Sequence, residues 1–150
     1  MMQVRDARVQ DAEAVAALVA ELGFPASPHE VAHRLAALMH AGELVLVAEV
    51  DATVAGLAAV HITPVLHRPT CVGRITALVV SELRRGQGVG RALVEAAERL
   101  VADRGCALIE ITSNRQLADA HAFYEHLGYE VTSLRFKKIL MPAERSAEPG

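Results

Sequence analysis

The stretch that decides the fold reads Arg84-Arg85-Gly86-Gln87-Gly88-Val89-Gly90-Arg91. It follows an apolar run, Ile75 to Val80, and opens a helical pattern, Val89 to Val101. The first N–H groups of a helix have no partner within the helix, and the peptide dipoles add partial positive charge there. Because glycines keep side chains away, a phosphate can approach these N–H groups closely. The stretch therefore predicts a phosphate site, to which three arginines can add charge-assisted contacts.

Two well-known phosphate-binding loops do not fit this stretch. A P-loop requires Lys and then Ser or Thr after its last glycine, whereas Arg91 and Ala92 follow here. A dinucleotide-binding loop requires Gly-x-Gly-x-x-Gly, whereas the glycines here are Gly86, Gly88 and Gly90. An ordinary glycine-rich turn between a strand and a helix is the other interpretation.

The loop resembles the acetyl-CoA loop of the GNAT superfamily of N-acetyltransferases, whose pattern is Gln/Arg-x-x-Gly-x-Gly/Ala. Arg85 to Gly90 fits every position of that pattern. A second stretch, Ala120-His121-Ala122-Phe123-Tyr124-Glu125-His126-Leu127-Gly128-Tyr129, is similar to the family's other signature, Ala-x-x-(Phe/Leu)-Tyr-x-x-x-Gly-(Phe/Tyr). Two such motifs at the expected separation make the resemblance specific, and it covers residues 70–131.

The resemblance implies a GNAT fold of the α/β (α+β) class. That fold has a mixed, mostly antiparallel central sheet with two splayed parallel strands, flanked by four helices. We therefore expect a single acetyltransferase domain over residues 1–141. Residues 142–150, with two prolines and mixed charges, are expected to form a disordered tail.

The resemblance also implies acetyl-CoA as the acetyl donor and no metal. Backbone groups of Leu78, Val79 and Val80 are expected to pair with the pantetheine arm as an added strand does. The pyrophosphate is expected on the loop residues Arg85, Gly86, Gln87, Gly88, Val89, Gly90 and Arg91.

The resemblance places Tyr124 near the thioester sulfur. An amine attacks the acyl carbon and CoA leaves as a thiolate, so an acid is needed there. A phenol, with a pKa of about 10, can protonate such a leaving group. The alternative for Tyr124 is an aromatic ring that packs under the cofactor arm and moves no proton.

One position departs from the family pattern. The family usually has an Asn seven residues before this Tyr, where the chain has Leu117. Asn114 lies three residues earlier, and we include it as a weaker candidate for cofactor contact.

The attacking amine must lose a proton, because a free alkylammonium group has a pKa of about 10. Glu110, in the middle of a predicted strand, is the first candidate for the base. His61, in another predicted strand, is the second candidate and a candidate contact to the substrate. The alternatives are an ion-paired strand residue for Glu110 and a hydrogen-bonded histidine for His61.

His29-Glu30-Val31-Ala32-His33 matches the His-Glu-x-x-His motif of zinc peptidases. A capping box gives a simpler explanation, with Ser27 at the N-cap, Pro28 at the first helical position and Glu30 reaching back to Ser27. A third zinc ligand is not evident nearby, so a zinc peptidase is the least favoured function.

The composition limits the function classes. The 150 residues are 52% hydrophobic and 22% charged, which is typical of one globular domain. A formal charge of −3 argues against a nucleic-acid binder, and no apolar run reaches membrane-spanning length. Cys71 and Cys106, the only cysteines, lie in strand-like runs and are interpreted as reduced, buried thiols of a cytoplasmic protein.

Apolar patterns predict the remaining elements. Strands are expected at residues 3–9, 44–50, 54–62, 70–80, 106–112 and 129–140, and helices at 11–22, 28–41, 89–104 and 119–127. The strands at 44–50 and 54–62 are apolar on nearly every residue, so we expect them at the centre of the sheet.

Two function classes follow. The first is an N-acetyltransferase that moves the acetyl group of acetyl-CoA to a primary amine, small molecule or peptide, by direct attack. The second is a CoA-binding sensor or interaction module without turnover. The identity of the acceptor is left open, a homodimer is allowed, and no partner among nucleic acids or membranes is expected.

Overall fold

The computed structural model describes residues 1–112 and 118–141. Asn114 and the expected tail, residues 142–150, lie outside the described residues. The chain forms two compact units, Met1–Thr112 and Ser113–Gly150. Among the described residues, no helix is long and apolar enough to cross a bilayer.

The first unit is built on a sheet with the strand order β1-β2-β3-β4-β5. The parallel pairing of β4 with β5 and the antiparallel pairing of all other neighbours confirm a mixed, mostly antiparallel sheet. The apolar strands β2 and β3 lie inside this order, as predicted. The strands are β1 (Met2–Asp6), β2 (Leu44–Val50), β3 (Thr53–Thr63), β4 (Val72–Val80) and β5 (Leu108–Ile111).

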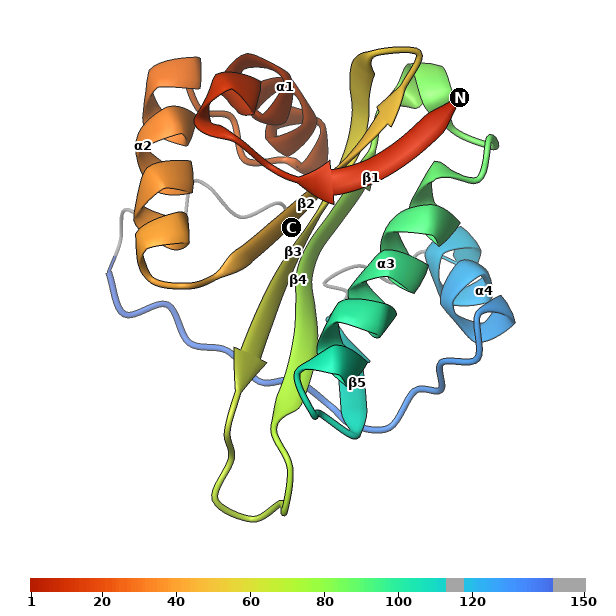
Figure 1. Ribbon diagram of the computed structural model, residues 1–150. Helices are drawn as coiled ribbons and strands as arrows, with labels where there is room; N and C mark the ends of the chain where they lie inside the picture. Colours follow the sequence, from red (N-terminus) through yellow and green to blue (C-terminus); the bar gives the residue numbers. More distant parts are fainter. Residues whose placement is uncertain (113–117, 142–150) are drawn as a thin grey trace. The chain divides into compact units, whose positions relative to one another are not determined.

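The described residues contain four α-helices, as predicted, and two short 3₁₀ helices. Helices α1 and α2 lie on one side of the sheet and α3 lies on the other (Figure 1). The α-helices are α1 (Ala12–Leu22), α2 (Pro28–His40), α3 (Val89–Asp103) and α4 (Ala118–His126), and the 3₁₀ helices are η1 (Val9–Asp11) and η2 (Glu82–Arg84).

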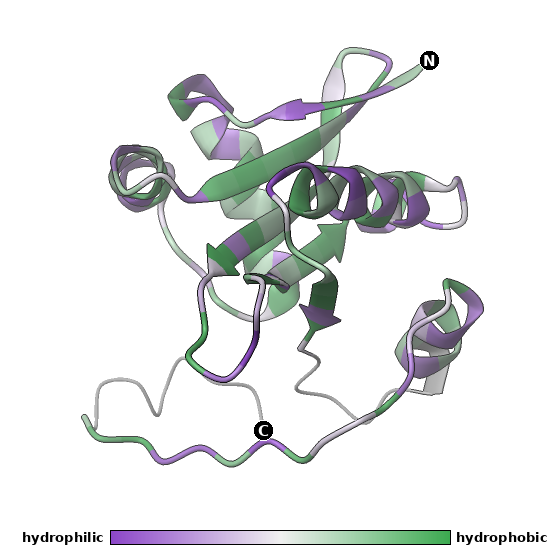
Figure 2. Ribbon diagram, turned by 60° about the horizontal axis from the view of Figure 1, so that its bottom comes forward, coloured by the Kyte–Doolittle hydropathy of each residue, from purple (hydrophilic) through white to green (hydrophobic). Residues whose placement is uncertain are grey.

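The sheet buries an apolar face under each helical layer. Val47, Leu57 and Val79 face one another across three strands and pack with α1 and α2. On the other side, α3 buries Val89, Leu93, Val94, Ala97 and Val101, each at most 2% exposed. Figure 2 shows the same division, with hydrophobic strands and helices that are hydrophilic on part of their surface. The helices therefore fix the strand ends that carry the candidate site.

Helix α3 approaches the sheet at two glycines. A Cβ atom at Gly56 would lie 3.0 Å from the Leu93 side chain and from the Val79 carbonyl oxygen. A Cβ atom at Gly73 would clash with the side chain of Val101. Because glycine carries only a hydrogen atom in place of a side chain, α3 can lie close to β3 at Gly56 and close to β4 at Gly73.

Gly73→Ala is expected to destabilise the fold by about 1–3 kcal/mol, the usual cost of overpacking a filled core. Val101→Ala removes the opposing methyl groups, so the double variant should lose less stability than the two single variants added together. Urea unfolding of the four proteins measures this coupling. Additive losses would contradict the contact.

The capping box at the start of α2 is confirmed. The Glu30 N–H donates to Ser27 Oγ at 3.1 Å, and the Ser27 N–H donates to Glu30 Oε1 at 3.1 Å. This contact holds the pKa of the Glu30 carboxyl below its usual value. The Glu30 side chain of the His29–His33 motif therefore caps the N-terminus of α2. The described residues hold no cluster of three metal-ligating side chains.

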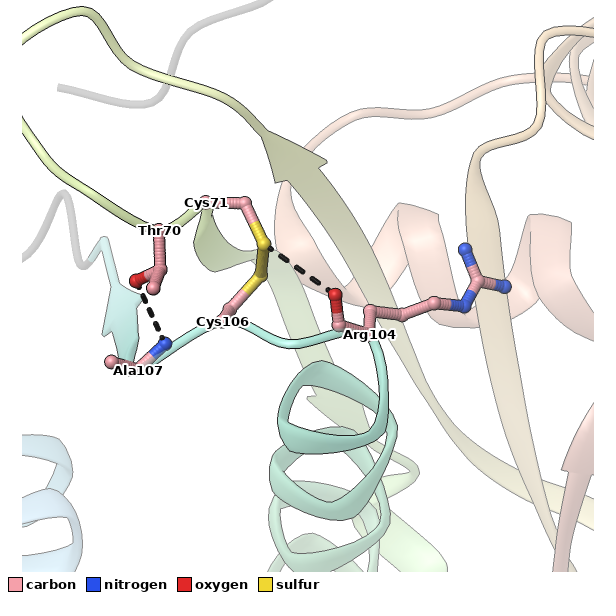
Figure 3. Close-up of a disulfide and its surroundings, with 5 residues drawn as sticks. All are labelled: Thr70, Cys71, Arg104, Cys106 and Ala107. Carbon is pink, nitrogen blue, oxygen red and sulfur yellow. Dashed lines mark hydrogen bonds between the residues drawn. A yellow bond between two sulfur atoms is a disulfide. The ribbon is translucent and has the colours of Figure 1, made fainter.

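The interpretation of both cysteines as free thiols is wrong, because Cys71 and Cys106 form a disulfide. Cys71 directly precedes β4, and Cys106 lies two residues before β5. The two strands are parallel neighbours, so their starting points lie side by side, with the Cα atoms of the cysteines 4.7 Å apart. Thr70 Oγ1 also accepts a hydrogen bond from the Ala107 N–H at 3.2 Å, which links the same two segments (Figure 3).

Replacing both cysteines by serine is expected to lower the free energy of unfolding by about 3–4 kcal/mol. The disulfide closes a loop with a sequence separation of 35, and loss of that constraint raises the entropy of the unfolded chain. Urea unfolding of the oxidised protein and of the Cys71→Ser/Cys106→Ser variant measures the difference. Wild type with a reductant is the matched control. A difference below about 1 kcal/mol would contradict this constraint.

The strand predicted at residues 129–140 is also wrong, since this segment forms no strand among the described residues. Several of its apolar side chains are more than 80% exposed, namely Val131, Leu134, Phe136 and Leu140. A strand needs a partner for its N–H and C=O groups, and the alternating pattern of side chains does not supply one.

Candidate active site

The glycine loop leads from η2 into α3. Gly86 and Gly88 have φ angles of +79° and +83°, a region that side chains other than glycine rarely adopt. Gly88 is the N-cap of α3 and supplies no side-chain hydrogen bond. A Cβ atom at either glycine would meet nothing within 4 Å, so the space above the loop is open. The structure therefore confirms a glycine loop that opens directly onto a helix start.

The first turn of α3 presents positive charge toward that space. The first bond of the helix runs from the Ala92 N–H to the Gly88 carbonyl oxygen at 3.1 Å. The N–H groups of Val89, Gly90 and Arg91 precede it and have no acceptor within the helix. The first turn contains no acidic side chain. This arrangement suits an anion.

Three arginines surround the loop in loose ion pairs. Arg84 lies 3.8 Å from Asp51, Arg85 lies 3.6 Å from Glu21, and Arg91 lies 3.6 Å from Glu95. Such exposed pairs contribute about 0–1 kcal/mol each, so a ligand phosphate can replace the carboxylates at small cost. Arg85 also donates from Nε to the Val80 carbonyl oxygen at 3.3 Å, which ties the loop to the end of β4.

In the part of the chain that the structure describes, one edge of the end of β4 has no strand partner. Leu78, Val79 and Val80 pair with Ala58, Leu57 and Gly56 of β3. On the other edge, β5 pairs with β4 only from Val72 to Ile75, and the last contact is from the Thr112 N–H to the Ile75 carbonyl oxygen at 3.5 Å. Within the described residues, the pairing of β5 with β4 therefore ends at Ile75, where β5 itself ends.

A β-bulge in β4 directly follows the last residue that pairs with β5. Val60 pairs with Ile75 and Ala59 with Ala77, so Thr76 is the extra residue on β4. Its hydroxyl donates to the Ala59 carbonyl oxygen at 3.4 Å. Bulges bend a strand and are common beside active sites.

A row of charged and polar side chains crosses the sheet just before the bulge. His61 on β3 pairs with Arg74 on β4, which pairs with Glu110 on β5. Arg74 Nη2 donates to Glu110 Oε1 at 3.4 Å. His61 Nδ1 lies 2.7 Å and 2.8 Å from the two carboxylate oxygens of Glu43. The structure thus brings the two predicted base candidates into one row.

Sequence reasoning missed two members of this row. Glu43 stands between the Gly42 turn that ends α2 and the start of β2, and Arg74 interrupts the apolar run of β4. A charged residue inside an otherwise apolar strand is the signal that could have identified Arg74. Glu43 gave no such signal, because its partner is 18 residues away.

Tyr124 lies in α4, within the second unit. Its ring makes edge contacts with Phe123 and Tyr129, with ring centroids 5.4 Å and 6.4 Å apart. The turn after α4 contains Gly128, and there the Tyr129 N–H donates to the Tyr124 carbonyl oxygen at 3.0 Å. Burial raises the pKa of the Tyr124 phenol, so the hydroxyl keeps its proton at neutral pH.

The sequence profile of the acetyltransferase (GNAT) family matches residues 11–129. The chain belongs to the GNAT acetyltransferase family. This GNAT chain is 32% identical to an aminoalkylphosphonate N-acetyltransferase of Salmonella typhimurium. The alignment extends over 152 residues and covers 92% of this chain and 91% of that protein. It is accordingly an acyltransferase of the N-acetyltransferase type.

Solved structures agree with this assignment. An acetyltransferase of Trypanosoma brucei is 25% identical, with a TM-score of 0.80 over 93% of this GNAT chain and 100% of the other. An aminoglycoside N-acetyltransferase in complex with CoA has a TM-score of 0.80 at 19% identity, over 94% of this chain and 96% of the other, which shows the shared fold. Acetyl-CoA is the donor that the family uses.

Proposed function

We propose that this chain transfers the acetyl group of acetyl-CoA to a primary amine by direct attack, without an acyl-enzyme. The observation that carries the proposal is the open helix start of α3 beside the end of β4, whose outer edge has no strand partner among the described residues. The helix start suits a pyrophosphate, and the strand edge suits an extended arm that carries amide groups. Cys71 and Cys106 are joined to each other and offer no free thiol as a nucleophile.

The proposed cofactor contacts follow from this arrangement. The pyrophosphate binds the N–H groups of the loop from Arg85 to Arg91, with the arginine side chains around it. The pantetheine arm pairs with those backbone groups of the segment Leu78, Val79 and Val80 that point away from β3. Asn114 remains a weaker candidate for contact with the same arm.

Tyr124 is the proposed general acid. When the amine nitrogen attacks the thioester carbon, the C–S bond breaks and the sulfur leaves with the electron pair. The phenol proton then passes to the sulfur. The raised pKa of Tyr124 supports this role, because a phenol that stays protonated is available as a donor.

The base that receives the ammonium proton is Glu110 or His61. Both lie in the polar row that crosses the sheet before the bulge. Glu110 faces the guanidinium of Arg74, and His61 is held by Glu43.

The acceptor is proposed to be a small primary amine that also carries an anionic group. The relative named for aminoalkylphosphonates supports this class. Arg74 supports it as well, because its side chain is 44% exposed in the same row and its contact with Glu110 is long. An exposed guanidinium can bind a phosphonate through two parallel hydrogen bonds.

An acceptor screen that follows thiol release from acetyl-CoA tests this function. Aminomethylphosphonate and 2-aminoethylphosphonate are expected to release thiol, and ethanolamine, which lacks the anion, is the matched control. Release with ethanolamine alone would contradict the anionic acceptor. Acetyl-CoA binding by calorimetry without thiol release from any amine would favour the non-catalytic CoA sensor.

Three broader expectations also remain proposals. The two units are proposed to form one catalytic domain over residues 1–141, which the family match across residues 11–129 supports. A cytoplasmic location suits the use of acetyl-CoA, and thiol trapping in cells would show whether the disulfide exists there. A homodimer can be tested by light scattering.

A further inference from the structure

Glu43 and His61 form a carboxylate–imidazole pair on the sheet face. Glu43 follows the turn at Gly42, where its N–H donates to the Leu38 carbonyl oxygen at 2.9 Å. That turn fixes the backbone of Glu43 at the entry to β2. Its carboxylate reaches His61 Nδ1 with both oxygens, at 2.7 Å and 2.8 Å. Glu43, directly before β2, thereby holds the ring of His61 on β3.

The pair determines which nitrogen of His61 is basic. A carboxylate only accepts hydrogen bonds, so Nδ1 carries the hydrogen that points to Glu43. Nε2 of the neutral ring then holds a lone pair. Its neighbour is Thr63 Oγ1 at 3.0 Å, a hydroxyl that can donate to this lone pair or rotate away. The same order of carboxylate, imidazole and acceptor nitrogen creates the base in hydrolase triads.

His61 lies close to the bulge in β4. It shares the face of Leu57, because alternate residues of a strand point the same way, and its side chain is 42% exposed. Its pairing partner Arg74 stands two residues before the bulge at Thr76. His61 and the bulge therefore lie on paired strands, with one pair of partners, Val60 and Ile75, between them.

Glu110 is less suited to this task. Its carboxylate faces the guanidinium of Arg74, and an ammonium ion bound there would stand beside a like charge. Charged groups that border His61 come from three segments, namely Glu43 before β2, Arg74 on β4 and, through Arg74, Glu110 on β5.

We propose that His61 is the general base of the transfer and that Glu43 is the residue that positions it. The inference rests on the proposed function. An alkylammonium carries three protons and the amide product keeps one. His61 Nε2 takes the first proton before attack and passes it to solvent. The second leaves the nitrogen after attack and, through solvent, replaces the proton that Tyr124 gave to the sulfur.

Steady-state kinetics with 2-aminoethylphosphonate at saturating acetyl-CoA, measured across pH, test the proposal. His61→Gln should lower kcat/KM by about 10²–10⁴, the usual range for a general base. It should also remove the acidic limb of the pH profile. Glu110→Gln is the matched control, and it should keep that limb.

Glu43→Gln tests the positioning role, since it keeps the shape of the side chain and removes its charge. It should lower kcat/KM at least about tenfold, towards the roughly 10⁴-fold that a triad loses when its carboxylate is neutralised. Glu43→Asp should recover part of the rate.

Folding and binding are checked by circular dichroism and by acetyl-CoA calorimetry. For His61→Ala, added imidazole should restore part of the rate if the missing group is a base. A His61→Gln rate within about threefold of wild type, with an unchanged acidic limb, would overturn the proposal. So would loss of the limb in Glu110→Gln alone. Wild type that releases no thiol with any amine would instead overturn the proposed function, and this inference with it.

Discussion

Gly88→Asp is expected to weaken acetyl-CoA binding by about 10²–10³-fold, because a carboxylate beside the pyrophosphate costs several kcal/mol. The fold should survive, since the space above Gly88 is open and Asp is among the residues that best tolerate a positive φ. Calorimetry with acetyl-CoA measures the affinity, and urea unfolding measures the stability.

Gly88→Asn is the matched control for this charge. Asparagine has nearly the same size as aspartate and tolerates the same backbone conformation, but it adds no charge. Most of the loss should therefore appear with aspartate and not with asparagine. Equal affinities for wild type and both variants would show that the helix start of α3 does not hold the pyrophosphate.

Tyr124→Phe is expected to lower kcat by about 10²–10⁴ if the phenol protonates the leaving thiolate. Affinity for acetyl-CoA should change little, because the contact matters mainly as the thiolate forms. The raised pKa adds a second expectation. The protonated phenol is the active form, so the wild-type rate should fall only at pH values above the usual phenol range, about 10. The phenylalanine variant should lack that basic limb.

Tyr129→Phe is a suitable control, since it removes a hydroxyl from a ring that contacts Tyr124. It should leave kcat nearly unchanged. A Tyr124→Phe rate within about threefold of wild type, with chemistry shown to be rate-limiting, would mean that Tyr124 only packs and that water supplies the proton.

The features predicted correctly from the sequence are local ones. The glycine loop depends on glycines at positive φ and on the helix that begins within three residues. The capping box of Ser27 and Glu30 depends on one helical turn. The strands β2 and β3 were evident because both of their faces are covered, which leaves an apolar residue at nearly every position.

The features that were missed depend on distant pairing. The contact between Glu43 and His61 cannot be predicted without the register of β2 against β3. The bulge at Thr76 likewise depends on the register of β3 against β4. The disulfide forms because the starts of β4 and β5 lie side by side, and the two parallel strands expected in the fold were the available signal. Residues 129–140 show the opposite error, because a strand-like pattern does not provide a neighbouring strand.

The unpaired end of β4 has a consequence for handling the protein. A strand edge with free N–H and C=O groups is a template on which another extended chain can add, and folded proteins usually cover such edges. From Ala77 to Val80, β5 does not cover this edge in the described residues. If the pantetheine arm fills it, the empty enzyme carries a docking place for other extended segments, and CoA acts as a protecting agent during purification and storage. At a CoA concentration about 100 times its Kd, the folded state would also gain about 2.7 kcal/mol.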